Sequence, residues 1–117
     1  MRKITLPQML ILEYLLKNGQ SRMSDIAHSM SVTTAAMTGI IERLVRDGWV
    51  MRILDSQDRR IVRVKLTAKG TEMIRRLTLQ KRQMIVDIFG KISQEERDDY
   101  LKILSHIHRI VTQQQPA

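Results

Sequence analysis

The eighteen residues from Arg52 to Lys69, RILDSQDRRIVRVKLTAK, decide the fold class of this chain. In the second half of this stretch the side chains alternate as a half-buried β-strand requires, with Val62, Val64 and Leu66 on one face. The residues before this strand, DSQDRR at 55–60, form a charged segment that fits the tip of a β-hairpin. A basic loop held out on a hairpin is typical of a wing that touches nucleic acid, and an ordinary solvated turn is the alternative.

The charge of the chain favours a polyanionic partner. Its 117 residues include 20 Lys and Arg against 12 Asp and Glu, which gives a formal net charge of +8. Seven basic residues and three acidic ones lie between Arg43 and Lys65, so the positive excess is concentrated around the expected hairpin. A local excess of this kind is the electrostatic footprint of a nucleic-acid-binding protein.

Composition excludes several other classes of protein. At 117 residues with 43% hydrophobic content, the chain is expected to form one structural domain. Cysteine is absent, which excludes disulfide frameworks, thiol redox sensing and Cys-based zinc sites. The N-terminal MRKITLPQ is too short and too polar for a signal peptide, and no apolar run has the length of a membrane span. We therefore expect a soluble cytoplasmic protein with no membrane partner.

Start and stop signals divide the segment before the hairpin into three helices. Thr5 is followed by Pro7 and Gln8, which is the pattern of a capping box at a helix start. The three expected N-caps are Thr5, Ser24 and Thr33. The corresponding ends are Asn18–Gly19, Met30 and Asp47–Gly48. Helix, tight turn, helix and then hairpin is the order of a winged helix-turn-helix, with Trp49 expected to fill the base of the hairpin.

The expected third helix, over 33–47, has one apolar face and one small, polar face. Its core stripe is predicted to comprise Met37, Ile40, Ile41, Leu44 and Val45. The opposite side carries Ala35, Gly39, Glu42 and Arg46, flanked by Ala36, Thr38 and Arg43. Small residues let a helix backbone lie close to base edges in a major groove, where Thr hydroxyls can form hydrogen bonds and Ala methyls can meet thymine methyls. The alternative is that Ala and Gly pack against a neighbouring helix.

A set of motifs spread over this arrangement resembles one protein family. The motifs are Leu6-Pro7-Gln8, Ile26-Ala27, Met30-Ser31-Val32-Thr33, Ala36 to Leu44, Asp47-Gly48, Asp58-Arg59-Arg60 and Leu66-Thr67-Ala68-Lys69-Gly70. Together they resemble the multiple-antibiotic-resistance regulator (MarR) family over about Ile4 to Ile74. The resemblance implies a mainly α fold with a small β-hairpin: a winged helix-turn-helix followed by long C-terminal dimerisation helices. It also implies a homodimeric transcription factor, usually a repressor, that binds double-stranded DNA at a pseudo-palindromic operator and is often released by a small-molecule effector.

The resemblance assigns roles to the wing and to the third helix. The last Arg of the family's wing motif enters the minor groove and the Asp two residues earlier orients it, which here are Arg60 and Asp58. A narrow minor groove has a negative potential that attracts a guanidinium, and a nearby carboxylate can hold the arginine side chain in place. The alternative role for Asp58 is to stabilise the turn, and the two roles can coexist. Arg59 and Arg63 are expected to contact phosphates, with solvated side chains as the alternative. Recognition-helix contacts are expected from Thr33, Thr34, Ala35, Thr38 and Arg43.

The C-terminal part is expected to supply the dimer interface. Residues 1–66 are assigned to the DNA-binding lobe and 67–117 to a helical dimerisation region, with one helix from Thr67 to Phe89 and another beginning at the Ser93–Glu96 capping box. Relatives usually carry a helix before the one at Pro7, which this chain is expected to lack, so dimerisation should rest on the final helix. That helix is apolar over a wide arc, which requires two partners or a second contact within the chain. The expected dimer contacts are Leu101, Leu104, Ile107, Ile110 and Val111.

Other functions have weaker support in the sequence. His106 and His108 are two apart on an expected helix and do not share a face, so neither a metal site nor a cofactor is expected. No nucleophile, phosphate-binding glycine loop or carboxylate pair stands in a recognisable arrangement, so we expect no enzyme. The remaining alternative is a winged-helix module that docks on another protein without sequence-specific DNA binding.

Overall fold

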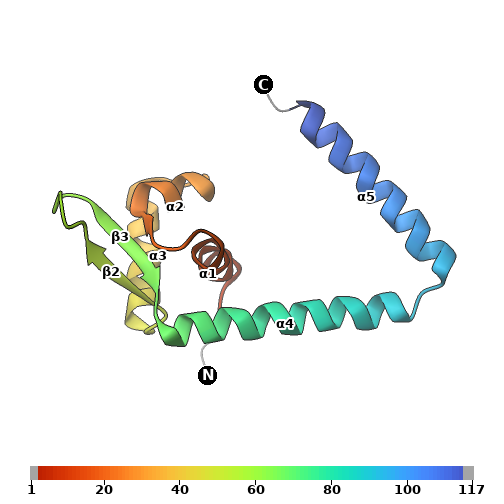
Figure 1. Cartoon of the computed structure of the whole chain (residues 1–117), viewed down its shortest axis with the longest axis horizontal. Coiled ribbons are helices and arrows are strands. Elements are labelled where there is room, and N and C mark those ends of the chain that lie inside the picture. The colour runs from red at the N-terminus through yellow and green to blue at the C-terminus, as the bar shows by residue number, and fades with distance from the viewer. Residues whose placement is uncertain (1–2, 115–117) are drawn as a thin grey trace. The chain divides into compact units, whose positions relative to one another are not determined.

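The computed structural model describes residues 3–114 (Figure 1). Residues 1–2 of the predicted DNA-binding lobe and residues 115–117 of the predicted dimerisation region lie outside this range. Two compact units divide between Thr78 and Leu79. The elements in chain order are α1 (Leu6–Asn18), β1 (Ser21–Arg22), α2 (Met23–Ser29), α3 (Thr34–Arg46), β2 (Val50–Leu54), β3 (Val62–Leu66), α4 (Ala68–Gly90) and α5 (Gln94–Gln114). The sequence pattern placed the junction before α4, whereas the first part of α4 belongs to the first unit, where Ile74 is fully buried in the core.

The first helix begins and ends as predicted. The Thr5 hydroxyl accepts a hydrogen bond from the backbone N–H of Gln8 at 3.2 Å, and the Gln8 side chain accepts one from the backbone N–H of Thr5 at 3.0 Å. This reciprocal pair satisfies two N–H groups that have no partner within the helix. Gly19 follows the last turn with φ 75°, a conformation that favours glycine.

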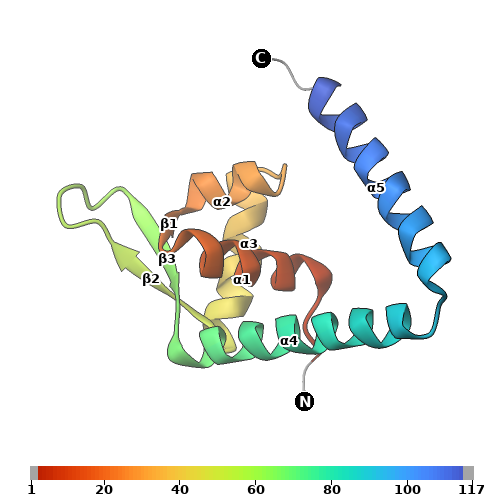
Figure 2. The ribbon, with the colours of Figure 1, turned by 45° about the vertical axis from the view of Figure 1, so that its right-hand side comes forward.

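The predicted start of the second helix is wrong, because a two-residue strand precedes it. Ser21 and Arg22 pair with Val64 and Arg63 of β3, so the chain passes from strand to helix between Arg22 and Met23. Ser24 therefore lies inside α2 and does not cap it. A strand of two residues has no alternation long enough to be seen in the sequence. Figure 2 shows β1 beside β3.

The third helix and the core agree with the predicted apolar stripe. The Thr33 hydroxyl accepts from the backbone N–H of Ala36 at 3.1 Å, and Gly48 ends the helix with φ 80°. Met37, Ile41 and Leu44 are fully buried, while Ile40 and Val45 pack at the edge of the core. The buried cluster also draws on α1, α2, the sheet and α4, through Ile11, Leu12, Leu15, Ile26, Ala27, Trp49, Val50, Val64 and Ile74.

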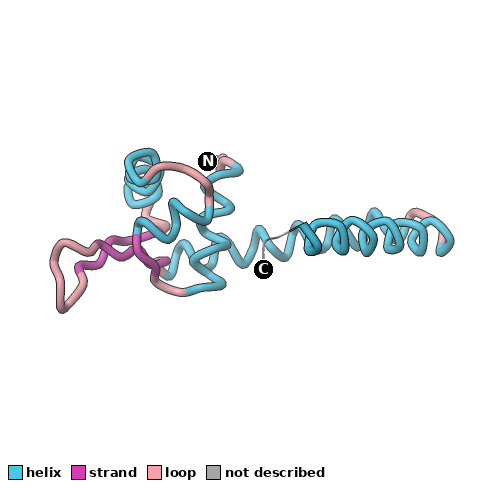
Figure 3. Tube along the Cα trace, turned by 90° about the horizontal axis from the view of Figure 1, so that it is seen from above, coloured by secondary structure: helices cyan, strands magenta, loops and turns pink. Residues whose placement is uncertain are grey.

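The predicted hairpin is confirmed, and the sheet has one strand more than the sequence indicated. Its order is β1-β3-β2, and all pairs are antiparallel. The register of β2 and β3 runs from Val50 opposite Leu66 to Leu54 opposite Val62. The loop that joins these two strands projects from their end (Figure 3). Trp49 is 5% exposed at the base of the hairpin, as expected.

The start of α4 is bonded to the turn between α3 and β2. The Thr67 hydroxyl donates to the carbonyl of Gly48 at 2.6 Å and accepts from the N–H of Gly70 at 3.0 Å. The Thr67 N–H donates to the carbonyl of Trp49 at 3.1 Å, and the Lys69 ammonium donates to the carbonyl of Asp47 at 2.9 Å. The Thr67–Gly70 motif thus joins the end of the recognition helix to the beginning of α4.

The second unit begins in α4 and includes α5, and the turn between these helices is well bonded. Ser93 and Glu96 form the predicted capping box at the start of α5. The Arg97 guanidinium donates to the carbonyls of Phe89 and Ile92 at 2.6 and 3.0 Å, which satisfies acceptors left at the end of α4. None of the helices over residues 3–114 combines the length and the hydropathy that crossing a bilayer requires.

Candidate nucleic-acid interface

At the tip of the wing, Asp58 holds Arg60 through three hydrogen bonds. The guanidinium Nε and Nη2 of Arg60 donate to Oδ1 and Oδ2 of Asp58 at 3.1 and 3.3 Å. The backbone N–H of Arg60 also donates to Oδ1, at 3.0 Å. Asp58 therefore orients the arginine and stabilises the turn at the same time, so the two roles considered for it coexist. The Arg60 side chain is 90% exposed, which leaves it accessible to a partner.

The same contacts keep Asp58 ionised. The hydrogen bonds from the Arg60 side chain lower the pKa of the Asp58 carboxyl below its ordinary value, and the Arg60 backbone N–H acts in the same direction. Burial opposes this shift, and the charge of Arg22 adds a smaller lowering. The carboxylate is thus available to orient Arg60 at neutral pH.

A hollow of about 420 Å³ lies between the wing and α3. It brings two predicted contact residues of α3, Thr34 and Thr38, to the same space as Arg60 of the wing. Its full lining is Arg22, Met23, Ser24, Thr34, Thr38, Arg52, Arg60, Ile61 and Val62. Two residues predicted to contact the major groove and the residue predicted to enter the minor groove therefore border the same hollow.

Two arginines of this hollow, Arg22 and Arg52, were missed from the sequence. The position of Arg22 depends on β1, a strand too short to predict. The sequence did contain a signal for Arg52. It lies two residues after the buried Val50 in β2, so both residues are on the same face of the strand. Its guanidinium lies 3.7 Å from the carboxylate of Glu42 on the outer face of α3.

The outer face of α3 is open, as its small residues suggested. Ala35, Ala36 and Gly39 are exposed, and a Cβ placed on Gly39 would meet no atom within 4 Å. Packing against a neighbouring helix therefore does not account for this glycine in the described part of the chain. The Thr38 hydroxyl donates to the carbonyl of Thr34 at 2.9 Å, so it faces a partner as an acceptor.

The other predicted contacts lie outside the hollow. Thr33 caps α3 with its hydroxyl as the acceptor, which leaves its O–H hydrogen able to donate. Arg43 is exposed in the last turn of α3, and Arg59 is exposed in the wing. Arg63 is half-buried in β3, between Arg22 on one side and Ile53 on the other. None of these four borders the hollow.

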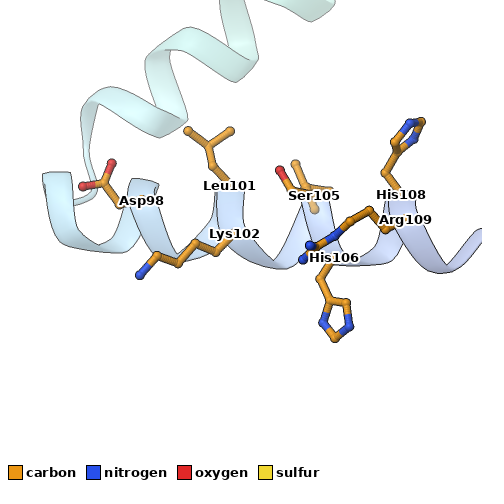
Figure 4. Close-up of a pocket in the computed structure, with 8 residues that line it drawn as sticks. Asp98, Leu101, Lys102, Ser105, His106, His108 and Arg109 are labelled. Atoms are coloured by element: carbon orange, nitrogen blue, oxygen red, sulfur yellow. The ribbon is translucent and has the colours of Figure 1, made fainter.

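The second unit offers a different kind of surface. Among the described residues, no cluster of His, Cys, Asp and Glu could hold a metal ion. A hollow of about 1220 Å³ is bordered by α5 alone, and Figure 4 shows its side chains pointing in several directions around that helix, with His106 and His108 on opposite sides. The five predicted dimer residues, Leu101, Leu104, Ile107, Ile110 and Val111, are between 42% and 58% exposed.

Comparison with known proteins places the chain in a family. The family model described as "MarR family" matches residues 4–62. The uncharacterized HTH-type transcriptional regulator YfiV of Bacillus subtilis (strain 168) is 31% identical over 106 residues, which cover 91% of this chain and 66% of YfiV. The HTH-type transcriptional repressor YetL of the same organism is 29% identical over 84 residues, which cover 72% of this chain and 50% of YetL.

Solved structures agree with these sequence matches. FabT of Streptococcus pneumoniae, in a crystal structure in complex with DNA, has a TM-score of 0.81 and 25% identity, and the match covers 97% of this chain and 79% of FabT. The chain spans one half to two thirds of the length of YfiV and YetL. The winged-helix fold, the wing motif and these matches agree, and the chain belongs to the MarR family.

Proposed function

We propose that this protein is a sequence-specific DNA-binding transcriptional regulator that places α3 in the major groove and the wing, 55–60, in the minor groove. The observation that carries the proposal is the position of Arg60, which is held by Asp58 at the edge of a hollow that Thr34 and Thr38 share. FabT, whose structure in complex with DNA superposes on this chain, supports the same partner.

The major-groove surface is the outer face of α3. Ala35 and Gly39 have no side-chain bulk beyond a methyl group, so the backbone can lie close to base edges. The Thr33 hydroxyl has a hydrogen to donate, and the Thr38 hydroxyl presents lone pairs. Arg43 lies at the far end of this face and fits a phosphate or a guanine edge.

The minor-groove probe is Arg60. Two of its guanidinium nitrogens face Asp58, and its Nη1 has no hydrogen-bond partner among residues 3–114. A guanidinium fixed in this way loses little side-chain entropy when it enters a narrow, electronegative minor groove. Arg59 and Arg63 form no ion pair with a carboxylate among residues 3–114, and they serve as phosphate contacts in this proposal.

Homodimerisation through α5 is part of the proposal. The exposed apolar side chains of α5, named above, give this helix a surface that a second copy can cover. Two-fold symmetry then requires a pseudo-palindromic operator. We expect DNA binding to repress transcription, the activity that the name of the relative YetL states for that protein. We also expect a small-molecule effector to release the protein from DNA.

A selection of bound duplexes from random oligonucleotides, combined with a measurement of solution mass, tests this function. The expected result is a dimer and a near-palindromic site whose half-sites are about 10 base pairs apart, centre to centre. A monomer on a single asymmetric site would overturn the dimer. Recovery of no preferred sequence would overturn the regulator and favour a module that docks on another protein.

A further inference from the structure

Three guanidinium groups from three different segments meet at the hollow between the wing and α3. Arg22 comes from β1, Arg52 from β2 and Arg60 from the wing loop, and the hydroxyls of Ser24, Thr34 and Thr38 border the same space. No Asp or Glu among residues 3–114 borders it. The lining therefore brings three positive charges together, which suits an anion, whereas the Thr38 hydroxyl already donates to Thr34 and has no hydrogen left for one.

The arginines differ in how far the protein already occupies them. Arg60 is held by Asp58 through two of its nitrogens. Arg52 has a long, exposed contact of 3.7 Å with Glu42, which leaves most of its five N–H donors available. Arg22 is an exposed residue with no hydrogen bond or ion pair to another described residue, although its charge interacts with the Asp58 carboxylate. Arg22 and Arg52 are thus the groups with free capacity for a ligand.

The position of the hollow indicates which anion it meets, on the premise of the proposed function. In B-DNA the major and minor grooves are neighbours separated by one sugar-phosphate strand. A protein that places α3 in one groove and the wing in the next must straddle that strand. The hollow lies between these two elements, so the strand that separates the grooves passes over it.

We propose that this hollow seats one backbone phosphate of the strand between the two grooves, bound by the guanidinium groups of Arg22 and Arg52. The contact carries no base preference of its own, because every nucleotide presents the same phosphate. Its role is to set the register, since it holds the strand midway between the helix that reads bases and the arginine that enters the minor groove. Arg22 and Arg52 are contact residues in this account, and Glu42 is a positioning residue for Arg52.

Salt dependence measures the proposed contact. Binding of the full chain to its selected duplex and to a scrambled duplex is measured at several salt concentrations for the wild type, Arg22→Gln, Arg52→Gln and Arg22→Lys. Each Gln variant should weaken both duplexes to a similar extent and reduce the magnitude of the slope of log K against log salt. The reduction should be at most about 0.9 for each half-site, the value for the complete loss of one phosphate contact, because the other arginine still faces the phosphate. Arg22→Lys keeps the charge and should restore most of the slope. The matched control is Lys3→Gln, which removes an equal charge from a residue that does not border the hollow.

A scan with uncharged methylphosphonate linkages, placed one at a time along the selected duplex, locates the phosphate. At one position on each half-site, the substitution should weaken wild-type binding and have a smaller effect on Arg22→Gln, which keeps only Arg52 on that phosphate. That position should lie on the strand between the α3 contacts and the Arg60 contact. Additive losses at every position, or a slope change in Lys3→Gln as large as that in Arg22→Gln, would overturn the hollow and indicate a diffuse field.

The outcomes separate this inference from the function on which it rests. A preferred site with an unchanged slope in Arg22→Gln would overturn the phosphate seat and keep the regulator. A reduced slope without any preferred site would support the seat and overturn sequence-specific regulation. Absence of duplex binding by the wild type would overturn both. Thermal unfolding of each variant checks that the fold is intact, and exposed Arg22 should tolerate Gln with little change in Tm.

Discussion

Gly70 lies directly against the backbone of Trp49. A Cβ added to Gly70 would lie 1.9 Å from the Trp49 carbonyl oxygen and 2.8 Å from its carbonyl carbon. That oxygen also accepts the N–H of Thr67, so the first turn of α4 lies on the residue that leads from the recognition helix into β2. The Leu-Thr-x-Lys-Gly motif is therefore a backbone contact between α4 and the base of the wing, and its glycine is required by space.

Gly70→Ala should destabilise the first unit. The added methyl group meets backbone atoms, which cannot turn away as a side chain can, so the packing of α4 on the hairpin base must shift at a cost of about 1–3 kcal/mol or more. Urea unfolding of the full chain measures the change. Gly90→Ala is the matched control, because a Cβ at Gly90 meets nothing within 4 Å. Equal unfolding midpoints for the two variants would contradict the proposed contact.

Thr67→Val should also lower the free energy of unfolding. The substitution keeps the shape of the side chain but removes the donor to Gly48 and the acceptor for the Gly70 N–H. The loss of a partly buried hydrogen bond and of a helix cap costs about 1–2 kcal/mol. Thr67→Ser keeps the hydroxyl and should retain most of the stability. A Thr67→Val variant as stable as the wild type in the same urea titration would show that these hydrogen bonds do not contribute to stability.

Gly39→Ala should raise the stability of the protein and lower its affinity for DNA. A Cβ at this position meets no atom of the protein, and alanine is a better helix former than glycine, so the helix should gain about 1 kcal/mol of stability. Affinity for the selected duplex should fall, because the methyl group occupies the face that approaches the bases. Thermal unfolding and fluorescence anisotropy measure the two effects. Unchanged affinity would show that DNA does not approach α3 at Gly39.

The pH dependence of the wing follows from the lowered pKa of Asp58. A carboxyl whose folded-state pKa lies below its unfolded value contributes stability above the unfolded pKa and loses that contribution as pH falls through the folded one. The Asp58–Arg60 contact should therefore persist throughout the neutral range and break only below about 3.8, the ordinary value for Asp. An NMR titration of the Asp58 side-chain carboxyl carbon should show this low midpoint. Arg60→Ala should move the midpoint upwards, since Arg60 supplies the largest lowering contribution.

The parts of the fold that could be predicted from the sequence have apolar residues at a regular spacing or have capping residues that mark where a helix begins. The capping box at Thr5, the cap at Thr33, the apolar stripe of α3 and the hairpin all depend on residues close together in the chain. The error at Ser24 has the opposite origin: β1 exists because Ser21 meets Val64, a pairing between distant residues that leaves no local signal.

The same distinction applies to the candidate interface. The Asp58–Arg60 contact is local and was expected from the resemblance to the family's wing motif, because a carboxylate two residues away can hold the guanidinium. The hollow requires β1, β2, α3 and the wing to converge, so the contribution of Arg22 could not be predicted from its neighbours in the sequence. Arg52 could have been found, because it lies two residues after Val50 and therefore shares a strand face with a buried residue.

The most direct test of the account is the affinity of wild type and Arg60→Ala for the selected duplex and for variants of it with G·C pairs at the minor-groove positions. Arg60→Ala should lose about 1–3 kcal/mol of binding free energy and discriminate less between A·T and G·C pairs at those positions. Asp58→Asn should show a smaller loss of the same kind, because the guanidinium remains but is less firmly oriented. Equal affinity and equal discrimination by wild type and Arg60→Ala would contradict the placement of the wing in the minor groove.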